Sequence, residues 1–163
     1  MIVRFNSINP NDTYNVQGCR TKRNTPVDEY NCVGYAFETF AAHNIGEWEV
    51  NRCMMRAAWI GDYETALKLA AEAIMEEMPE WQLVEDYDRK TYPVRKYKVV
   101  AVRFSEDDYH AYKLARNGCW YNKWGCSSIF ERLPFDKVYA DEWQTSAYSA
   151  PYNSPILFFV RPR

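Results

Sequence analysis

One cysteine of the chain follows an asparagine at the start of a predicted helix, in the segment "DEYNCVGYAFE". Asn31 is a good N-cap, because its side-chain oxygen can accept a hydrogen bond from an N–H of the first turn. Cys32 then takes the first helical position, where the helix N-terminus favours the negatively charged, reactive thiolate. Cys32 is therefore a candidate nucleophile, although a cysteine on a small helix is also often a packed core residue.

A histidine could accept the proton of this thiol, and the chain contains two, His43 and His110. If the helix that begins at Cys32 continues to about Ala42, His43 lies about 16 Å away from Cys32 along the helix axis. His110 lies in "DYHAYKL", which has the composition of a strand. We therefore expect His110 to be the base, while noting that a lone strand histidine is commonly just half-buried and hydrogen-bonded.

The segment "ARNG", between "DYHAYKL" and "GCWYNKW", predicts a β-hairpin. A three-residue loop that ends with Gly118 in the left-handed conformation pairs Leu114 with Trp120. This register places Asn122 within reach of His110, whose ring N–H can donate to the amide oxygen. A two-residue turn would instead shift the register by one and turn Asn122 to the other face.

The helices that must position these residues precede residue 80. Asp62 is a good N-cap for the third of them, and Pro79 ends it. Gly34 weakens the first helix, so we expect it to allow another backbone to approach closely. Cys53 lies in an apolar part of the second helix and is expected in the core. The predicted helices span 32–42, 47–60 and 63–78.

Strands dominate the second half of the chain, where β-branched and aromatic residues are frequent. Helices followed by antiparallel strands predict an α+β domain. No repeat or Pro/Gly-rich linker divides the chain, so residues 1–163 are expected to form one domain. The predicted strands span 1–5, 81–86, 96–104, 108–114, 118–124 and 154–162.

The overall composition is that of a globular protein, with 47% hydrophobic residues and a formal net charge of −2. Lysines and arginines form no run, which argues against nucleic acid as a partner. No apolar run approaches the roughly 18 residues of a membrane span, and "MIVRFNSINPNDTYN" lacks the pattern of a signal peptide. We therefore expect a cytoplasmic protein that binds no membrane.

The five cysteines include no C-x-x-C pair, and with two histidines they form no pattern typical of a zinc site. We therefore expect reduced thiols, no metal and no cofactor. Of the other thiols, Cys119 and Cys126 lie near predicted hairpin ends with no helix to activate them, Cys53 lies in an apolar helix, and Cys19 lies in a polar loop.

Two segments resemble those of papain-like cysteine hydrolases, especially the compact NlpC-type branch. "NCVGYAFE" is similar to an N-C-Y-x-Y-A segment of uncharacterised bacterial and phage proteins with that architecture. "DDYHAYKLARNGCWYNKWG" is similar to their D-Y-H-F-Y-R-x-D-x-x-G-x-W-S-H-K-P-G segment. The resemblance covers roughly thirty of the 163 residues. It implies a papain-like fold, with N-terminal helices packed on a C-terminal antiparallel sheet.

The resemblance also implies a role for each matched residue. Cys32 corresponds to the nucleophile, His110 to the base and Asn122 to the residue that orients the base. The chain departs from the relatives at three positions. It has Asn122 where they carry a histidine, Val33 where they carry an aromatic residue and Trp124 where they carry a proline.

The function that the resemblance implies is that of a cysteine hydrolase of the peptidase or amidase class. Its substrate would be a protein or peptide, including a host protein if the chain is phage-encoded and works in the host cytoplasm. The backbone N–H of Cys32 and the nearby Asn31 would support the oxyanion. The predicted helices over about 47–78 form an insert outside the resemblance.

The alternative is a non-catalytic inhibitor or binding protein of phage type on the same scaffold. Large aromatic side chains are enriched in protein interfaces, so those outside the predicted site would suit this function if they are exposed. The candidates are Trp48, Trp59, Tyr87 and Tyr92.

Overall fold

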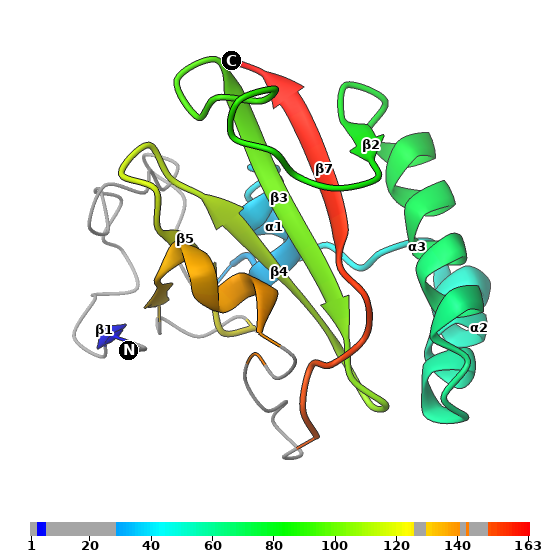
Figure 1. Ribbon diagram of the computed structural model, residues 1–163. Helices are drawn as coiled ribbons and strands as arrows, with labels where there is room; N and C mark the ends of the chain where they lie inside the picture. Colours follow the sequence, from blue (N-terminus) through cyan, green and yellow to red (C-terminus); the bar gives the residue numbers. More distant parts are fainter. Residues whose placement is uncertain (1–2, 6–28, 126–129, 141–142, 144–149) are drawn as a thin grey trace.

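The computed structural model describes residues 3–5, 29–125, 130–140, 143 and 150–163 (Figure 1). These residues form an α+β architecture around one antiparallel sheet, as the order of predicted helices and strands indicated. The strands pair in the order β1-β6-β5-β4-β3-β7-β2. Their bounds are β1 Val3–Phe5, β2 Gln82–Val84, β3 Tyr97–Phe104, β4 Tyr109–Leu114, β5 Trp120–Lys123, β6 Phe130–Leu133 and β7 Leu157–Pro162.

The helices are α1 (Cys32–Ala36), α2 (Trp48–Trp59) and α3 (Tyr63–Glu77), with a short 3-10 helix η1 (Phe135–Tyr139) after β6. The predictions of α2 and α3 are confirmed. At the start of α3 a side-chain oxygen of Asp62 accepts from the backbone N–H of Thr65 at 3.1 Å, as expected of an N-cap. Helices α2 and α3 pack against each other beside the β2 edge of the sheet (Figure 1).

The first helix is shorter than the sequence predicts, because it ends at Ala36 and not near Ala42. Glu38 and Phe40 have positive φ angles of 59° and 51°, which α-helices do not contain. A distant interaction accounts for the turn. The carboxylate of Glu38 forms ion pairs with three cations on neighbouring strands, Lys98, Lys113 and Arg161.

The predicted close approach of another backbone at Gly34 is confirmed. A Cβ atom at this position would overlap the carbonyl oxygen of Ala41, and the N–H of Phe40 donates to the carbonyl of Gly34 at 3.0 Å. The chain therefore folds back over α1 directly after leaving it.

Both faces of the sheet are covered. On one face the buried side chains of the three helices pack against residues of β3, β4 and β7, including Val100, Val102 and Phe159. On the other face the core contains aromatic residues of β4, β5 and η1 and of the segments that flank them, such as Trp120 and Tyr152. The strands that carry the candidate site are therefore enclosed on two sides.

One prediction about an individual side chain is wrong, that Cys53 lies in the core, and the condition of exposure set for Tyr87 is not met. Cys53 is exposed on α2, because the buried face of this helix is formed by Met54, Ala57 and Ala58. Tyr87, a candidate interface residue, is only 5% exposed because it packs against Trp120 and neighbouring rings. Cys19 and Cys126 lie outside the described residues.

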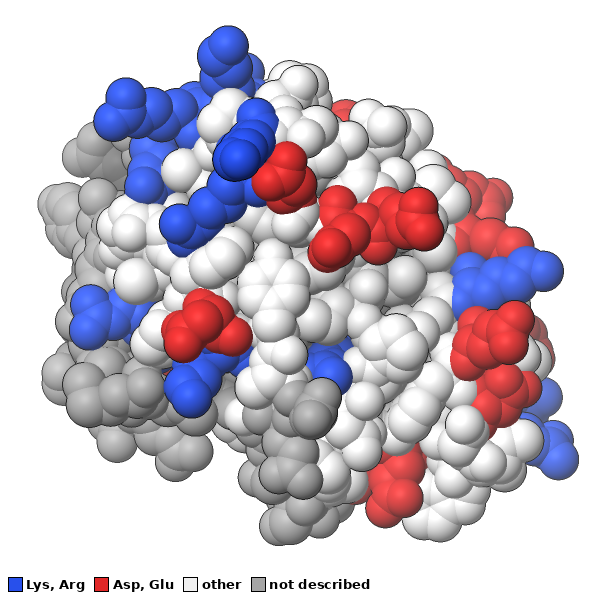
Figure 2. Space-filling model, in the orientation of Figure 1, with Lys and Arg blue, Asp and Glu red and all other residues white. Residues whose placement is uncertain are grey.

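On the face shown in Figure 2 the charges of the two signs are unevenly distributed, although basic side chains also lie at the right and an acidic one at the left. Figure 2 shows basic side chains gathered toward the upper left, above the ends of β3 and β7, and acidic ones toward the right, where α2 and α3 lie in Figure 1. None of the helices in the described residues has the length and hydropathy needed to cross a membrane.

Candidate active site

The hairpin between β4 and β5 has the register of the predicted three-residue loop. Leu114 pairs with Trp120, and the N–H of Ala115 donates to the carbonyl of Cys119 at 2.9 Å. Gly118 has a φ of 81°, the left-handed conformation that the loop requires. The register prediction is therefore confirmed, and the two-residue alternative is excluded.

His110 on β4 and Asn122 on β5 come together as this register predicts. Nε2 of His110 lies 2.7 Å from Oδ1 of Asn122, and both side chains are buried. An amide oxygen only accepts hydrogen bonds, so Nε2 carries the proton in this pair. Nδ1 is then the nitrogen that can accept a proton from another group.

That other group is the thiol of Cys32, which interacts with the same imidazole. Helix α1 packs against β4 and β5, and Cys32 occupies its first position. Cys32 interacts with His110 strongly enough to raise the pKa of the imidazole. The structure thus brings three predicted site residues from three elements together in one row, Cys32, His110 and Asn122.

The electrostatics of the row favour a charged imidazole. Burial by itself lowers the pKa of His110, because it removes the cation from water. The negative charge of Cys32 and hydrogen bonds with Cys32 and Asn122 act in the opposite direction and outweigh burial. The pKa of His110 therefore lies above the usual 6.5.

Aromatic rings enclose His110. Tyr152 stacks on the imidazole with ring centroids 5.4 Å apart, Tyr112 meets it edge-on at 5.2 Å, and Trp124 lies at 5.7 Å. The hydroxyl of Tyr152 donates to Oδ2 of Asp108 at 2.6 Å. These contacts limit rotation of the ring and exclude water from it.

Sequence reasoning missed the supporting role of Asp108 and Tyr152. Asp108 also raises the pKa of His110, as the smallest of the contributions. Its spacing of two residues from His110 was a usable signal, since such residues share one face of a strand. Tyr152 follows His110 by 42 residues, and no local pattern relates the two.

Asn31 caps α1 and also holds the returning chain. Its Oδ1 accepts from the N–H groups of Gly34 at 3.0 Å and His43 at 3.3 Å, and its Nδ2 donates to the carbonyl of His43 at 2.8 Å. The amide is therefore committed to positioning the backbone on which Cys32 sits.

The two histidines have different surroundings. Because α1 is short, the backbone of His43 returns to Asn31, and the expected separation along a continuous helix does not exist. The imidazole of His43 nevertheless points elsewhere, since its Nε2 lies 2.8 Å from a carboxylate oxygen of Glu77 on α3. His110 is thus the histidine in contact with Cys32.

The described residues contain no group of three or more histidine, cysteine, aspartate or glutamate side chains that could hold a metal ion. Comparisons of the chain with protein-family models, curated proteins and solved structures find no match.

Proposed function

We propose that the protein is a papain-like cysteine hydrolase that cleaves amide or thioester bonds in protein or peptide substrates. One observation carries the proposal: the imidazole of His110 is held between the thiol of Cys32 and the carbonyl of Asn122. In this arrangement a base accepts the proton of a nucleophile while a third group fixes the orientation of the base. The likeness of both segments to papain-like hydrolases supports it further.

The chemistry follows from the protonation states. Nδ1 of His110 accepts the thiol proton as Sγ of Cys32 forms a bond to the substrate carbonyl carbon. The backbone N–H of Cys32, which has no acceptor within the helix at this position, donates to the oxyanion. The C–N or C–S bond then breaks as His110 returns the proton to the leaving amine or thiol. Water hydrolyses the acyl-enzyme, with His110 accepting one of its protons.

Selective alkylation tests this function, because Cys32 and Cys53 differ in both exposure and neighbours. Cys32 is 8% exposed and interacts with His110, whereas Cys53 is exposed. The native protein is treated with limiting iodoacetamide at pH 6, and labelled peptides are quantified by mass spectrometry. We expect faster labelling at Cys32, because an imidazole beside a thiol can accept its proton and leave the reactive thiolate.

The two histidines provide matched variants for this experiment. In His110→Ala the labelling rate of Cys32 should fall by roughly a hundredfold, the lower range for loss of an acid–base group. His43→Ala should leave it unchanged, since His43 contacts Glu77. Labelling that follows exposure, with Cys53 ahead of Cys32 in the wild type, would contradict the proposed function.

A second candidate, a non-catalytic binding protein, is favoured by the exposed surface of α2. Trp48 and Trp59 at its two ends are 75% and 69% exposed, and Ile60, which directly follows Trp59, is 71% exposed. Tryptophan is enriched in protein interfaces. If Cys32 lacks selective reactivity while Trp48→Ala and Trp59→Ala abolish binding to a partner, this second function is the correct one.

A further inference from the structure

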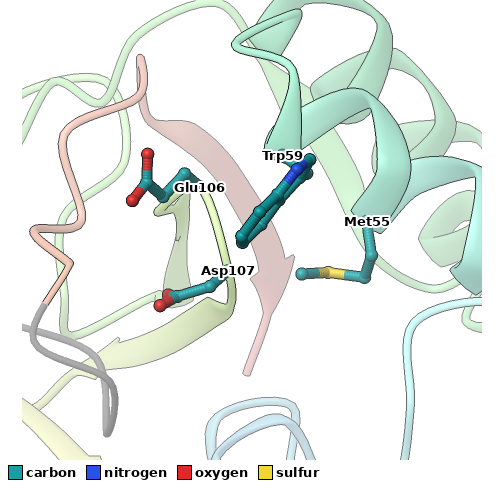
Figure 3. A pocket seen from close by; sticks show the side chains of 4 residues that line it. All are labelled: Met55, Trp59, Glu106 and Asp107. Carbon is teal, nitrogen blue, oxygen red and sulfur yellow. The ribbon is translucent and has the colours of Figure 1, made fainter.

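A cleft of about 560 Å³ lies between α2 and the turn that joins β3 to β4. Its lining has an apolar half and an acidic half, formed by Met55 and Trp59 on the helix and by Glu106 and Asp107 on the turn. Figure 3 shows the side chains of Met55 and Trp59 reaching from α2 toward the turn. Both carboxylates point away from the helix in the same view.

The apolar half offers an uncovered aromatic surface. Trp59 is 69% exposed although it lines a cleft, and Met55 beside it is half-buried. The face of an indole attracts cations through its quadrupole, more strongly than the ring of tyrosine or phenylalanine. A methionine side chain adapts its shape to the group that packs on it.

The acidic half carries uncompensated charge. Neither Glu106 nor Asp107 forms an ion pair with a lysine or arginine of the described residues. Oδ1 of Asp107 accepts from the hydroxyl of Ser105 at 2.7 Å, which fixes the turn and leaves the charge in place. Burial raises the pKa of Tyr63 at the start of α3, and the charges of Glu106 and Asp107 raise it further.

We propose that this cleft binds an arginine side chain of a polypeptide. The apolar stem packs on Met55 and Trp59, and the guanidinium extends past the indole to the carboxylates of Glu106 and Asp107. A long side chain with a cationic tip suits a cleft whose apolar and acidic halves follow one another. The planar guanidinium stacks on aromatic faces and donates in a fork that matches a carboxylate, which a lysine ammonium does not.

The cleft lies beside the candidate active site. Its acidic turn runs directly into β4, and Asp108 accepts from Tyr152, whose ring stacks on His110. Met55 packs against the apolar cluster that contains Cys32. On the proposed hydrolase function, a polypeptide held here by its arginine presents a neighbouring peptide bond to Cys32. The role of arginine in substrate selection rests on the proposed hydrolase function, whereas its binding does not.

Titration by NMR tests the binding without any need for turnover. The chain has six tryptophans, and the indole N–H signal of Trp59 is identified by its absence in Trp59→Phe. The uniformly labelled Cys32→Ala protein is titrated with N-acetyl-arginine amide and, separately, with N-acetyl-citrulline amide, which has nearly the same shape without the charge. We expect the signal of Trp59 to shift on addition of the arginine ligand. The signal of Trp48, which is exposed on the same helix but lies outside the cleft, should not shift.

The two ligands separate charge from shape. Citrulline should bind about fivefold more weakly than arginine, as expected for loss of one exposed ion pair. In the double variant Glu106→Gln, Asp107→Asn this preference should disappear, and added salt should reduce it in the parent protein. Equal affinity for both ligands, or equal shifts at Trp48 and Trp59, would overturn the proposal.

The outcomes also separate this site from the proposed reaction. An arginine preference together with unselective alkylation of Cys32 would retain the site and reject the hydrolase function. Selective alkylation of Cys32 without an arginine preference would retain the hydrolase function and reject the site.

Discussion

Two helices of this molecule each carry a described cysteine next to an apolar core, α1 with Cys32 and α2 with Cys53. Cys53 is exposed, and none of the interactions described above involves its thiol. Cys32 is buried at the start of its helix, where it interacts with a histidine from β4 and raises the pKa of that imidazole. Accessibility alone therefore ranks Cys53 as the more reactive thiol, whereas the chemistry of the neighbours ranks Cys32 first.

The surroundings of Cys32 are assembled from segments that lie far apart in the sequence. Asn31 fixes the start of α1, the hairpin places Asn122 against His110, and the turn after Phe104 supplies Asp108. The α2 position of Cys53 receives no comparable support from the sheet.

The largest expected effect is on stability at Gly34. In Gly34→Ala the added methyl overlaps the carbonyl of Ala41, a backbone atom that cannot move without displacing the chain after α1. We expect the free energy of unfolding to fall by about 3 kcal/mol, the upper range for overpacking. Urea denaturation followed by circular dichroism measures this change.

The control is Gly61→Ala, in the loop between α2 and α3. Gly61 has a φ of 80°, but apart from its two chain neighbours no atom of the described residues lies within 4 Å of the position of a Cβ. Only the backbone conformation should then cost free energy, about 1 kcal/mol for a left-handed residue. Equal losses in the two variants would show that α1 is not held by close packing.

The same residues show how much of the fold the sequence could predict. The third helix was predictable because its signals are local: the Asp62 cap, an apolar stripe and Pro79. The end of α1 was not, because the stripe continues through Phe37 and Phe40 while the chain turns to bring Glu38 to its three cations. These cations lie on β3, β4 and β7, beyond any local window.

The candidate site also contains residues whose placement local sequence signals predict and residues whose placement they do not. His110 and Asn122 were predictable together, because the loop chemistry of Gly118 determines the hairpin register. The position of Cys32 on α1 followed from its N-cap. The stacking of Tyr152 on His110 was not predictable, because it depends on how a segment near β7 packs over the sheet.

Removal of the orienting amide should lower the reactivity of Cys32 without changing that of Cys53. In Asn122→Ala the imidazole loses a hydrogen bond to its charged form, worth about 1.5–3 kcal/mol, so labelling of Cys32 should slow roughly ten- to hundredfold. Asn122→Asp keeps an acceptor and should restore most of the rate. The measurement is alkylation at pH 6 with peptide mapping, and an unchanged rate at Cys32 would remove Asn122 from the site.

The charge of Cys32 should be visible in the titration of His110. Cys32→Ser removes the largest favourable contribution, so the pKa of His110 should fall, whereas Cys53→Ser should leave it unchanged. The two histidine Cε1–H signals, assigned with His43→Ala, report this by NMR. An unchanged midpoint in Cys32→Ser would show that the thiolate does not act on the imidazole.

The raised pKa of His110 also links stability to pH. The folded state binds the proton more tightly than the unfolded state does, so the resulting stabilisation is fully present below about pH 6.5, the usual histidine pKa. It is lost as the pH rises through the pKa of His110 in the folded protein. The free energy of unfolding should thus fall over this range, and fall less in Cys32→Ser. A larger fall of the free energy of unfolding in Cys32→Ser would contradict the conclusion that Cys32 raises the pKa of His110.

The smallest expected effect comes from Asp108, whose charge is the weakest of the contributions that raise the pKa of His110. In Asp108→Asn the pKa of His110 should fall, and by less than in Cys32→Ser, when both are followed by NMR. Asp107→Asn is the matched control, since that carboxylate accepts from Ser105 and does not contribute to the pKa of His110.

Tyr152→Phe separates charge from geometry, because it retains the ring that stacks on His110 and removes only the hydroxyl that donates to Asp108. If Asp108→Asn shifts the titration and Tyr152→Phe does not, Asp108 acts on the imidazole through its charge. The opposite pattern would mean that the hydroxyl holds the stacked ring in place, and that Asp108 acts on His110 only through Tyr152.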